Sequence, residues 1–179
     1  MSRNRIGSIE SEAFAGGCCG LLERLALNSN QIERIEPLAF ATLTSLASLD
    51  LFGNRLKSVQ HADNWFQQPP ANLTALYLYN NEIETLGSSF SSKLASLRQL
   101  WLSNNRIERV SNATFQGLVR LELLYLDSNR VEAIEEGAFA ALTALSELHL
   151  HGNRLRTVRP EQLAGLRRLS RLDLSANLL

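Results

Sequence analysis

The 179-residue sequence predicts an α/β solenoid, in which one short strand per repeat joins a continuous parallel sheet. Three observations support this prediction. Leucine accounts for 35 of the 179 residues, the pattern L-x-x-L-x-L-x-x-N recurs along the chain, and its leucines alternate with other residues. Because alternate side chains of a strand point to opposite sides, this alternation sends the leucines into a core and the intervening residues outward.

The asparagine that ends the pattern sets the period of the repeat. Five of its seven intervals are 24 residues long, and the other two are 26 and 27. An asparagine amide can satisfy backbone groups at the sharp turn after a strand, which an aliphatic side chain cannot do. We therefore predict a structural, chain-turning role for eight residues. They are Asn4, Asn30, Asn54, Asn81, Asn105, Asn129, Asn153 and Asn177.

The other positions of each repeat are apolar at fixed distances from this asparagine. An aliphatic residue follows two and five positions later, and a phenylalanine or leucine follows ten positions later. One repeat cannot bury this set alone, so stacked neighbours must share a core. Phe90 lies one position early, and the 27-residue repeat has an insertion at residues 60–72 in which Phe66 is the expected core aromatic. The regular positions are Phe14, Phe40, Phe115, Phe139 and Leu163.

These motifs resemble the leucine-rich repeat family, and the resemblance covers the whole chain. The 24-residue length and its phenylalanine are similar to the typical class in extracellular proteins such as Toll-like receptors, Slit-like guidance proteins and variable lymphocyte receptors. The resemblance implies a right-handed leucine-rich repeat solenoid, with the parallel sheet on its concave face and loops with short helical turns on its convex face. It also implies that the eight asparagines form a hydrogen-bonded ladder.

The repeats occupy the sequence from end to end, so we expect residues 1–179 to form a single domain of about seven repeats. Met1 falls where a strand leucine is expected, and Leu179 comes two residues after Asn177. Solenoids need caps over their terminal layers, and the sequence shows no polar or disulfide-stapled cap. We therefore expect a domain open at both ends, as in a fragment of a longer array.

The composition excludes several classes of function. The 18 Lys and Arg balance the 18 Asp and Glu, which argues against nucleic-acid binding. No apolar run approaches the roughly 18 residues of a membrane span, and residues 1–7 lack the apolar stretch of a secretory signal. No catalytic motif occurs, so the sequence predicts neither an enzyme nor a cofactor. The adjacent Cys18 and Cys19 are poorly placed to pair with each other, and we interpret them as small half-buried residues.

In each repeat, the two positions on either side of the third leucine of the L-x-x-L-x-L-x-x-N pattern point onto the concave face. They form two columns that hold all three tyrosines, two of the three histidines and one of the two tryptophans. The first column is Ala26, Asp50, Tyr77, Trp101, Tyr125, His149 and Asp173. The second column is Asn28, Phe52, Tyr79, Ser103, Asp127, His151 and Ser175.

The aromatic residues of the two columns indicate a binding face for a protein partner. Aromatic side chains stack across strands for structural reasons, but a solvent-facing surface does not require them on consecutive strands. Such clusters are typical of protein-binding hot spots. The predicted partner-binding residues are Asp50, Phe52, Tyr77, Tyr79, Arg98, Trp101, Glu122, Tyr125, Asp127, His149 and His151.

His149 and His151 lie two residues apart on one predicted strand, so they face the same side, with Asp127 and Asp173 on the neighbouring strands. Two imidazoles and two carboxylates can bind zinc, or can make association pH-sensitive. A zinc site also needs groups that orient its ligands, and the sequence identifies none. We therefore interpret both histidines as solvated surface residues and predict no metal site.

Other surface positions carry weaker signals. The arginines that follow ladder asparagines, with Glu108 and Glu132 two positions further on, are interpreted as a solvated row of ion pairs, each contributing at most about 1 kcal/mol. Binding of heparin-like polymers or nucleic acid is the alternative. Asn72 and Asn112 begin glycosylation sequons outside both columns. The arginines are Arg5, Arg55, Arg106, Arg130 and Arg154.

The sequence thus predicts a non-catalytic protein–protein recognition module. Its expected role is ligand binding by a cell-surface or secreted receptor or adhesion protein, which would be an extracellular glycoprotein acting in signal transduction. No binding to nucleic acid and no direct membrane insertion are expected. The alternatives are an intracellular leucine-rich repeat scaffold, a structural spacer, or a regulatory segment of a larger protein.

Overall fold

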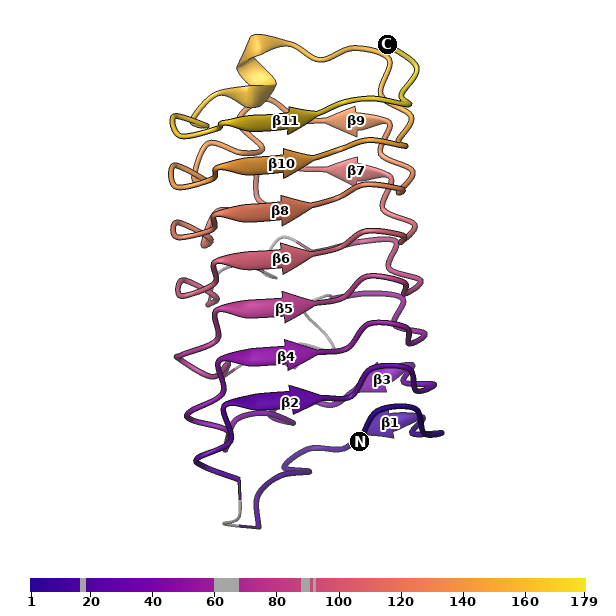
Figure 1. Ribbon diagram of the computed structural model, residues 1–179, viewed down its shortest axis with the longest axis vertical. Helices are drawn as coiled ribbons and strands as arrows, with labels where there is room; N and C mark the ends of the chain where they lie inside the picture. Colours follow the sequence, from indigo (N-terminus) through magenta and orange to yellow (C-terminus); the bar gives the residue numbers. More distant parts are fainter. Residues whose placement is uncertain (17–18, 60–67, 88–90, 92) are drawn as a thin grey trace.

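The computed structural model is a parallel β-solenoid, and it describes residues 1–16, 19–59, 68–87, 91 and 93–179. Seven three-residue strands stack one above the other and point the same way in a single sheet (Figure 1). In spatial order they are β2 (Arg24–Ala26), β4 (Ser48–Asp50), β5 (Ala75–Tyr77), β6 (Gln99–Trp101), β8 (Leu123–Tyr125), β10 (Glu147–His149) and β11 (Arg171–Asp173).

The leucine in the middle of each strand sets the register of the sheet. Leu100 of β6 pairs with Leu76 on one side and with Leu124 on the other. The equivalent leucines of β2 to β10 are buried, whereas Leu172 of the edge strand β11 is 37% exposed. Burying a leucine stabilises the fold by about 1.5–3 kcal/mol. The register that the sequence periodicity predicts is therefore the one that buries this leucine row.

The phenylalanines of the template extend the same core behind the sheet. Phe40, Phe115 and Phe139 are fully buried. The ring centroids of Phe115 and Phe139 lie 6.1 Å apart, and Phe14 lies 6.0 Å from Phe40 in a similar stacked arrangement. Each ring thus completes its burial against the next repeat, as a solenoid with a shared core requires.

Among the described residues, the convex side consists of loops and short turns, as the family resemblance implies, with almost no regular helix. In the described part of the chain the only helix is η1 (Pro160–Leu163), a four-residue 3₁₀ turn. Two short parallel pairs, drawn beside and behind the main sheet in Figure 1, join β1 (Ser8–Ile9) to β3 (Arg34–Ile35) and β7 (Arg109–Val110) to β9 (Ala133–Ile134). The apolar residues five and ten positions after the asparagine are five residues apart, which is not the i, i+3, i+4 spacing of an amphipathic helix. The structure is therefore the predicted solenoid, with short parallel strands joined by loops and turns.

The ladder asparagines connect each repeat to the one before it. Nδ2 of Asn105 donates to the carbonyl oxygens of Leu102 (3.0 Å) and Ser103 (3.3 Å) in its own repeat, and of Leu78 (3.0 Å) in the preceding one. Its Oδ1 accepts a hydrogen bond from the backbone N of Ile83 at 3.0 Å. Each of six other ladder asparagines makes the same four hydrogen bonds, namely Asn30, Asn54, Asn81, Asn129, Asn153 and Asn177.

Three residues named from the sequence, Phe66, Phe90 and Cys18, lie outside the described residues. Cys19 is half-buried and packs against the core. Within the described ranges, no helix has the length and apolar character needed to span a membrane.

Candidate functional site

The first column forms a continuous stack of rings on the concave face. Tyr77, Trp101, Tyr125 and His149 occupy the last position of four successive strands and are paired in register. Neighbouring strands lie about 4.8 Å apart, so side chains at this position must lie ring against ring. The Trp101 centroid is 3.9 Å from that of Tyr125 and 5.9 Å from that of Tyr77, and Tyr125 is 4.3 Å from His149. We call these four side chains the ring stack.

The second column is interrupted by a small residue. Phe52 and Tyr79 stack at 4.5 Å, but the next position is Ser103, whose hydroxyl donates to Oδ1 of Asp127 at 2.7 Å. A hollow of about 460 Å³, here called the ring hollow, lies at this gap beside the ring stack. Besides the four residues of the stack, it is lined by Tyr79, Ser103, Asn104, Asp127 and His151.

The predicted border residues fall into two groups. Asp127 is nearly buried and lines the ring hollow. Asp50, Arg98 and Glu122 lie outside its lining. Arg98 forms an ion pair with Glu122, and both side chains are about half exposed. An exposed pair of this kind contributes at most about 1 kcal/mol, so it orients the two side chains more than it stabilises the fold.

The environment of the hollow favours protonated tyrosines. Burial raises the pKa of Tyr79, and the Asp50 carboxylate and Tyr77 raise it further. Burial also raises the pKa of Tyr125; the Glu147 charge adds to this effect and Arg171 opposes it. Both phenols therefore remain hydrogen-bond donors at neutral pH.

We expect Asp50→Asn to have a higher melting temperature than the wild type, and we expect this difference to grow as the pH rises. Burial raises the pKa of Asp50, opposed by the hydrogen bond that its Oδ1 accepts from the backbone N of Phe52 at 3.3 Å. A raised carboxyl pKa gives a contribution to stability that is present below the unfolded-state pKa and is lost as pH rises through the folded-state pKa. An asparagine does not titrate and keeps an oxygen for Phe52. Melting curves from about pH 3 to about pH 7 test this, and a pH-independent difference between the two proteins would contradict it.

The two histidines differ in environment. His149 is only 6% exposed, because it stacks on Tyr125, and its Nε2 lies 3.1 Å from Oε2 of Glu147. The interpretation of His149 as a solvated residue is therefore wrong. His151 is half-buried, with Nε2 3.7 Å from Asp127 and Nδ1 3.6 Å from Asp173. Two hydrogen bonds from Ser175 lower the pKa of Asp173, and the one from the side chain has a larger effect than the one from the backbone.

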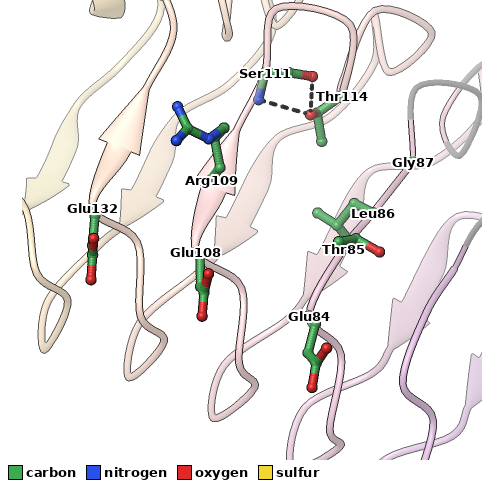
Figure 2. Close-up of a pocket in the computed structure, with 9 residues that line it drawn as sticks. All are labelled: Glu84, Thr85, Leu86, Gly87, Glu108, Arg109, Ser111, Thr114 and Glu132. Carbon is green, nitrogen blue, oxygen red and sulfur yellow. Dashed lines mark hydrogen bonds between the residues drawn. The ribbon is translucent and has the colours of Figure 1, made fainter.

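A second hollow, of about 440 Å³, lies beside β7. Figure 2 shows Glu84, Glu108 and Glu132 at equivalent positions of three successive repeats, with Arg109 above Glu108. Among the described residues, these three glutamates are not close enough to one another to share a metal ion. Among the described residues that line it, none is aromatic, so they offer no hot-spot side chain, and the ring hollow is the stronger candidate.

The arginines after the ladder asparagines pair with the preceding repeat. The sequence predicted a mutually paired surface row that includes Glu108 and Glu132. Stacked repeats are about 4.8 Å apart, whereas alternate residues of an extended chain are about 6–7 Å apart, so the neighbouring repeat offers the closer carboxylate. The pairs are Arg55–Glu33 (3.4 Å), Arg106–Glu82 (2.9 Å) and Arg154–Glu132 (3.2 Å).

The two sequon asparagines are exposed and lie outside both columns. Nδ2 of Asn72 donates to the carbonyl oxygen of Thr44 at 3.3 Å, and the backbone N of Asn112 donates to Glu135 at 3.0 Å. Glycans at these positions would leave the ring hollow open.

Three contributors to the site were missing from the predicted set. Ser103 and Asn104 line the hollow, and Glu147 holds the ring of His149. A usable signal existed for Ser103, the small residue that follows two aromatic ones in its column, and for Glu147, which lies two residues before His149 on the same strand face. Asn104 follows the column position and carries no comparable pattern.

A parallel sheet with one strand per repeat, bridged by asparagine side chains and backed by a leucine and phenylalanine core, defines a leucine-rich repeat solenoid. The family described as Leucine rich repeat matches residues 1–56, 71–131 and 120–179. The chain belongs to this family. No curated protein sequence matches it significantly.

Solved structures of the same class superpose on most of the chain. A crystal structure of a TLR13–ssRNA13 complex is 31% identical, with a TM-score of 0.89, and the match covers 96% of this chain and 24% of that one. An internalin of Listeria monocytogenes is 31% identical (TM-score 0.66), with 87% and 42% covered. A leucine-rich repeat protein of Leptospira interrogans is 30% identical (TM-score 0.75), with 87% and 38% covered. The chain thus spans less than half the length of each, and together these matches support an interaction module.

Proposed function

We propose that this chain is the ligand-binding segment of a cell-surface or secreted receptor or adhesion protein, and that it recognises a protein through the ring hollow. The observation that carries the proposal is the ring stack beside a hollow of about 460 Å³ on the concave face. Large rings held in place by their neighbours lose little conformational entropy on binding, and Trp and Tyr are enriched among hot-spot residues.

An unsatisfied donor in the ring stack supports the same proposal. The indole Nε1 of Trp101 is buried and has no hydrogen-bond partner within the described structure. A buried donor left unpaired costs about 1–3 kcal/mol. An acceptor from a bound partner would recover part of this free energy, which makes Trp101 the expected centre of the interface.

A protein partner fits the site better than single-stranded RNA, the ligand in the TLR13 complex. Binding of single strands relies on a positively charged groove and on ring faces that accept bases. Among the described residues, the lining of the ring hollow contains the carboxylate of Asp127 and neither Lys nor Arg. The faces of Trp101 and Tyr125 are also turned toward each other, with an interplanar angle of 7°.

The proposed role is recognition without catalysis. Ser103 donates its hydroxyl hydrogen to Asp127, and its contact is not with a histidine. A serine nucleophile requires an adjacent base to remove its proton. An extracellular location is consistent with exposed sequons at Asn72 and Asn112, and an intracellular scaffold using the same face is the alternative.

We expect Trp101→Ala and Tyr125→Ala each to weaken protein ligands of this face by more than about 30-fold, equivalent to about 2 kcal/mol at a hot spot. Suitable ligands can be selected from a displayed protein or peptide library against the whole chain and measured by surface plasmon resonance. Val119→Ala is the matched control, because Val119 is an exposed apolar residue outside both columns.

Ser103→Tyr tests the hollow without removing a ring. The added side chain should occupy the space beside Asp127 and reduce binding, while circular dichroism remains that of the wild type. If most selected ligands bind all three concave-face variants with wild-type affinity, the interface lies elsewhere on the solenoid.

A further inference from the structure

We propose that His149, His151 and Asp173 form a binding site for one zinc ion at the end of the ring stack. One ring nitrogen of each histidine and one carboxylate oxygen of Asp173 all lie within 4.8 Å of one another. The two histidines come from β10 and the turn that follows it, and Asp173 ends the neighbouring strand β11. The site does not depend on the proposed protein ligand.

The spacing between His151 and Asp173 suits two ligands of one ion. Nδ1 of His151 lies 3.6 Å from Oδ2 of Asp173, which is longer than a hydrogen bond. That nitrogen is buried and has no hydrogen-bond partner in the described structure. Zinc–nitrogen and zinc–oxygen bonds of about 2.0–2.1 Å place tetrahedral ligand atoms about 3.3 Å apart. A zinc ion between the two groups would satisfy both with little side-chain movement.

The structure supplies the orienting groups that the sequence could not identify. Glu147 contacts Nε2 of His149 at 3.1 Å. The backbone N and the hydroxyl of Ser175 donate to Oδ1 of Asp173 at 3.0 and 2.6 Å, while the other oxygen, Oδ2, faces His151. Hydrogen bonds of this kind fix ring orientation and ligand geometry in zinc sites, where carboxylate–histidine–zinc arrangements recur.

Asp127 completes the surroundings of His151. Its Oδ2 lies 3.7 Å from Nε2 of His151, on the ring nitrogen opposite the one that faces Asp173. This distance is longer than a hydrogen bond, but the negative charge of Asp127 still favours the tautomer with its proton on Nε2, which leaves Nδ1 free to bind a metal. Asp127 is itself held by Ser103, so the arrangement extends into the ring hollow.

The donor set favours zinc over the hard cations. Two imidazoles and one carboxylate suit zinc and its first-row neighbours, whereas calcium and magnesium prefer all-oxygen ligands. Three protein ligands leave a fourth tetrahedral position for water. Because His149 and His151 also line the ring hollow, the bound ion would face that hollow.

Isothermal titration of the whole chain with zinc chloride tests this site. We expect saturable binding of one ion per chain, and His151→Ala and Asp173→Asn should each weaken the zinc affinity by more than about tenfold. Asp50→Asn is the matched control, because Asp50 lies in the same column near the other end of the sheet, so its substitution should leave the zinc affinity unchanged. Visible absorption with cobalt(II) as a substitute should show tetrahedral bands in the wild type that both ligand variants lose.

His151 and Asp173 are chosen for substitution because both are partly exposed, whereas His149 is buried and its loss would disturb the ring stack. Circular dichroism of each variant checks that the fold is retained. Absence of saturable zinc binding by the wild type, or equal affinity in the wild type and both ligand variants, would overturn the proposal. Retained zinc binding in Trp101→Ala would support it even if that variant loses every protein ligand.

Discussion

Asn105→Leu should lower the free energy of unfolding by about 3–6 kcal/mol, since it leaves several buried backbone groups without partners. The side chain of Asn105 donates hydrogen bonds to the carbonyl oxygens of Leu78 and Leu102 and accepts one from the backbone N of Ile83, and all of these bonds are buried. Leucine has a similar size and shape but can neither donate nor accept. The effect should therefore come from unsatisfied groups and not from a change in packing volume.

Asn4→Leu is the matched control for this experiment. Asn4 occupies the same template position, but it is exposed and donates to the carbonyl oxygens of Met1 and Ser2, which water can replace. Urea denaturation followed by far-UV circular dichroism should show a large loss for Asn105→Leu and a loss below about 1 kcal/mol for Asn4→Leu. Similar midpoints for both variants would mean that the ladder contributes little to stability.

The sequence predicted the sheet because its period is simple. A leucine that recurs in the same place in each repeat can be buried only if the repeats stack in register, and Leu76, Leu100 and Leu124 pair as this argument requires. The backbone at the turn was not predictable in the same way. The residue before each ladder asparagine has positive φ, and although Gly53 and Gly152 suit this conformation, Arg3, Ser29, Asn80, Asn104, Ser128 and Ala176 also adopt it.

The candidate site was predictable as a surface but not as a cavity. Placing Tyr77, Trp101 and Tyr125 on one face needs only strand alternation and a parallel register. The hollow depends on a missing volume at Ser103, and the burial of His149 depends on how the ring of Tyr125 lies over it. Both are properties of side-chain packing between repeats, which no single repeat specifies.

Phe115→Ala should lower the free energy of unfolding by about 3–5 kcal/mol, because it removes a fully buried ring and leaves a cavity. It also ends the stacking of Phe115 on Phe139, a contact between adjacent repeats. In a solenoid each repeat is stabilised largely by its neighbours, so the loss should affect the unfolding of the whole central array. Urea denaturation followed by far-UV circular dichroism, which reports on the backbone of the whole array, is the appropriate measurement.

Leu163→Ala supplies the comparison, because Leu163 holds the same template position near the end of the array but is only half-buried. Leu163→Ala should lower the free energy of unfolding by less than about 2 kcal/mol. If both variants lower it equally, the stability of the core does not depend on enclosure between repeats. Phe115 lies outside both columns and outside the lining of the ring hollow. At temperatures where Phe115→Ala remains folded, its affinity for ligands of the concave face should therefore match the wild type, which separates the residues that build the solenoid from those that bind.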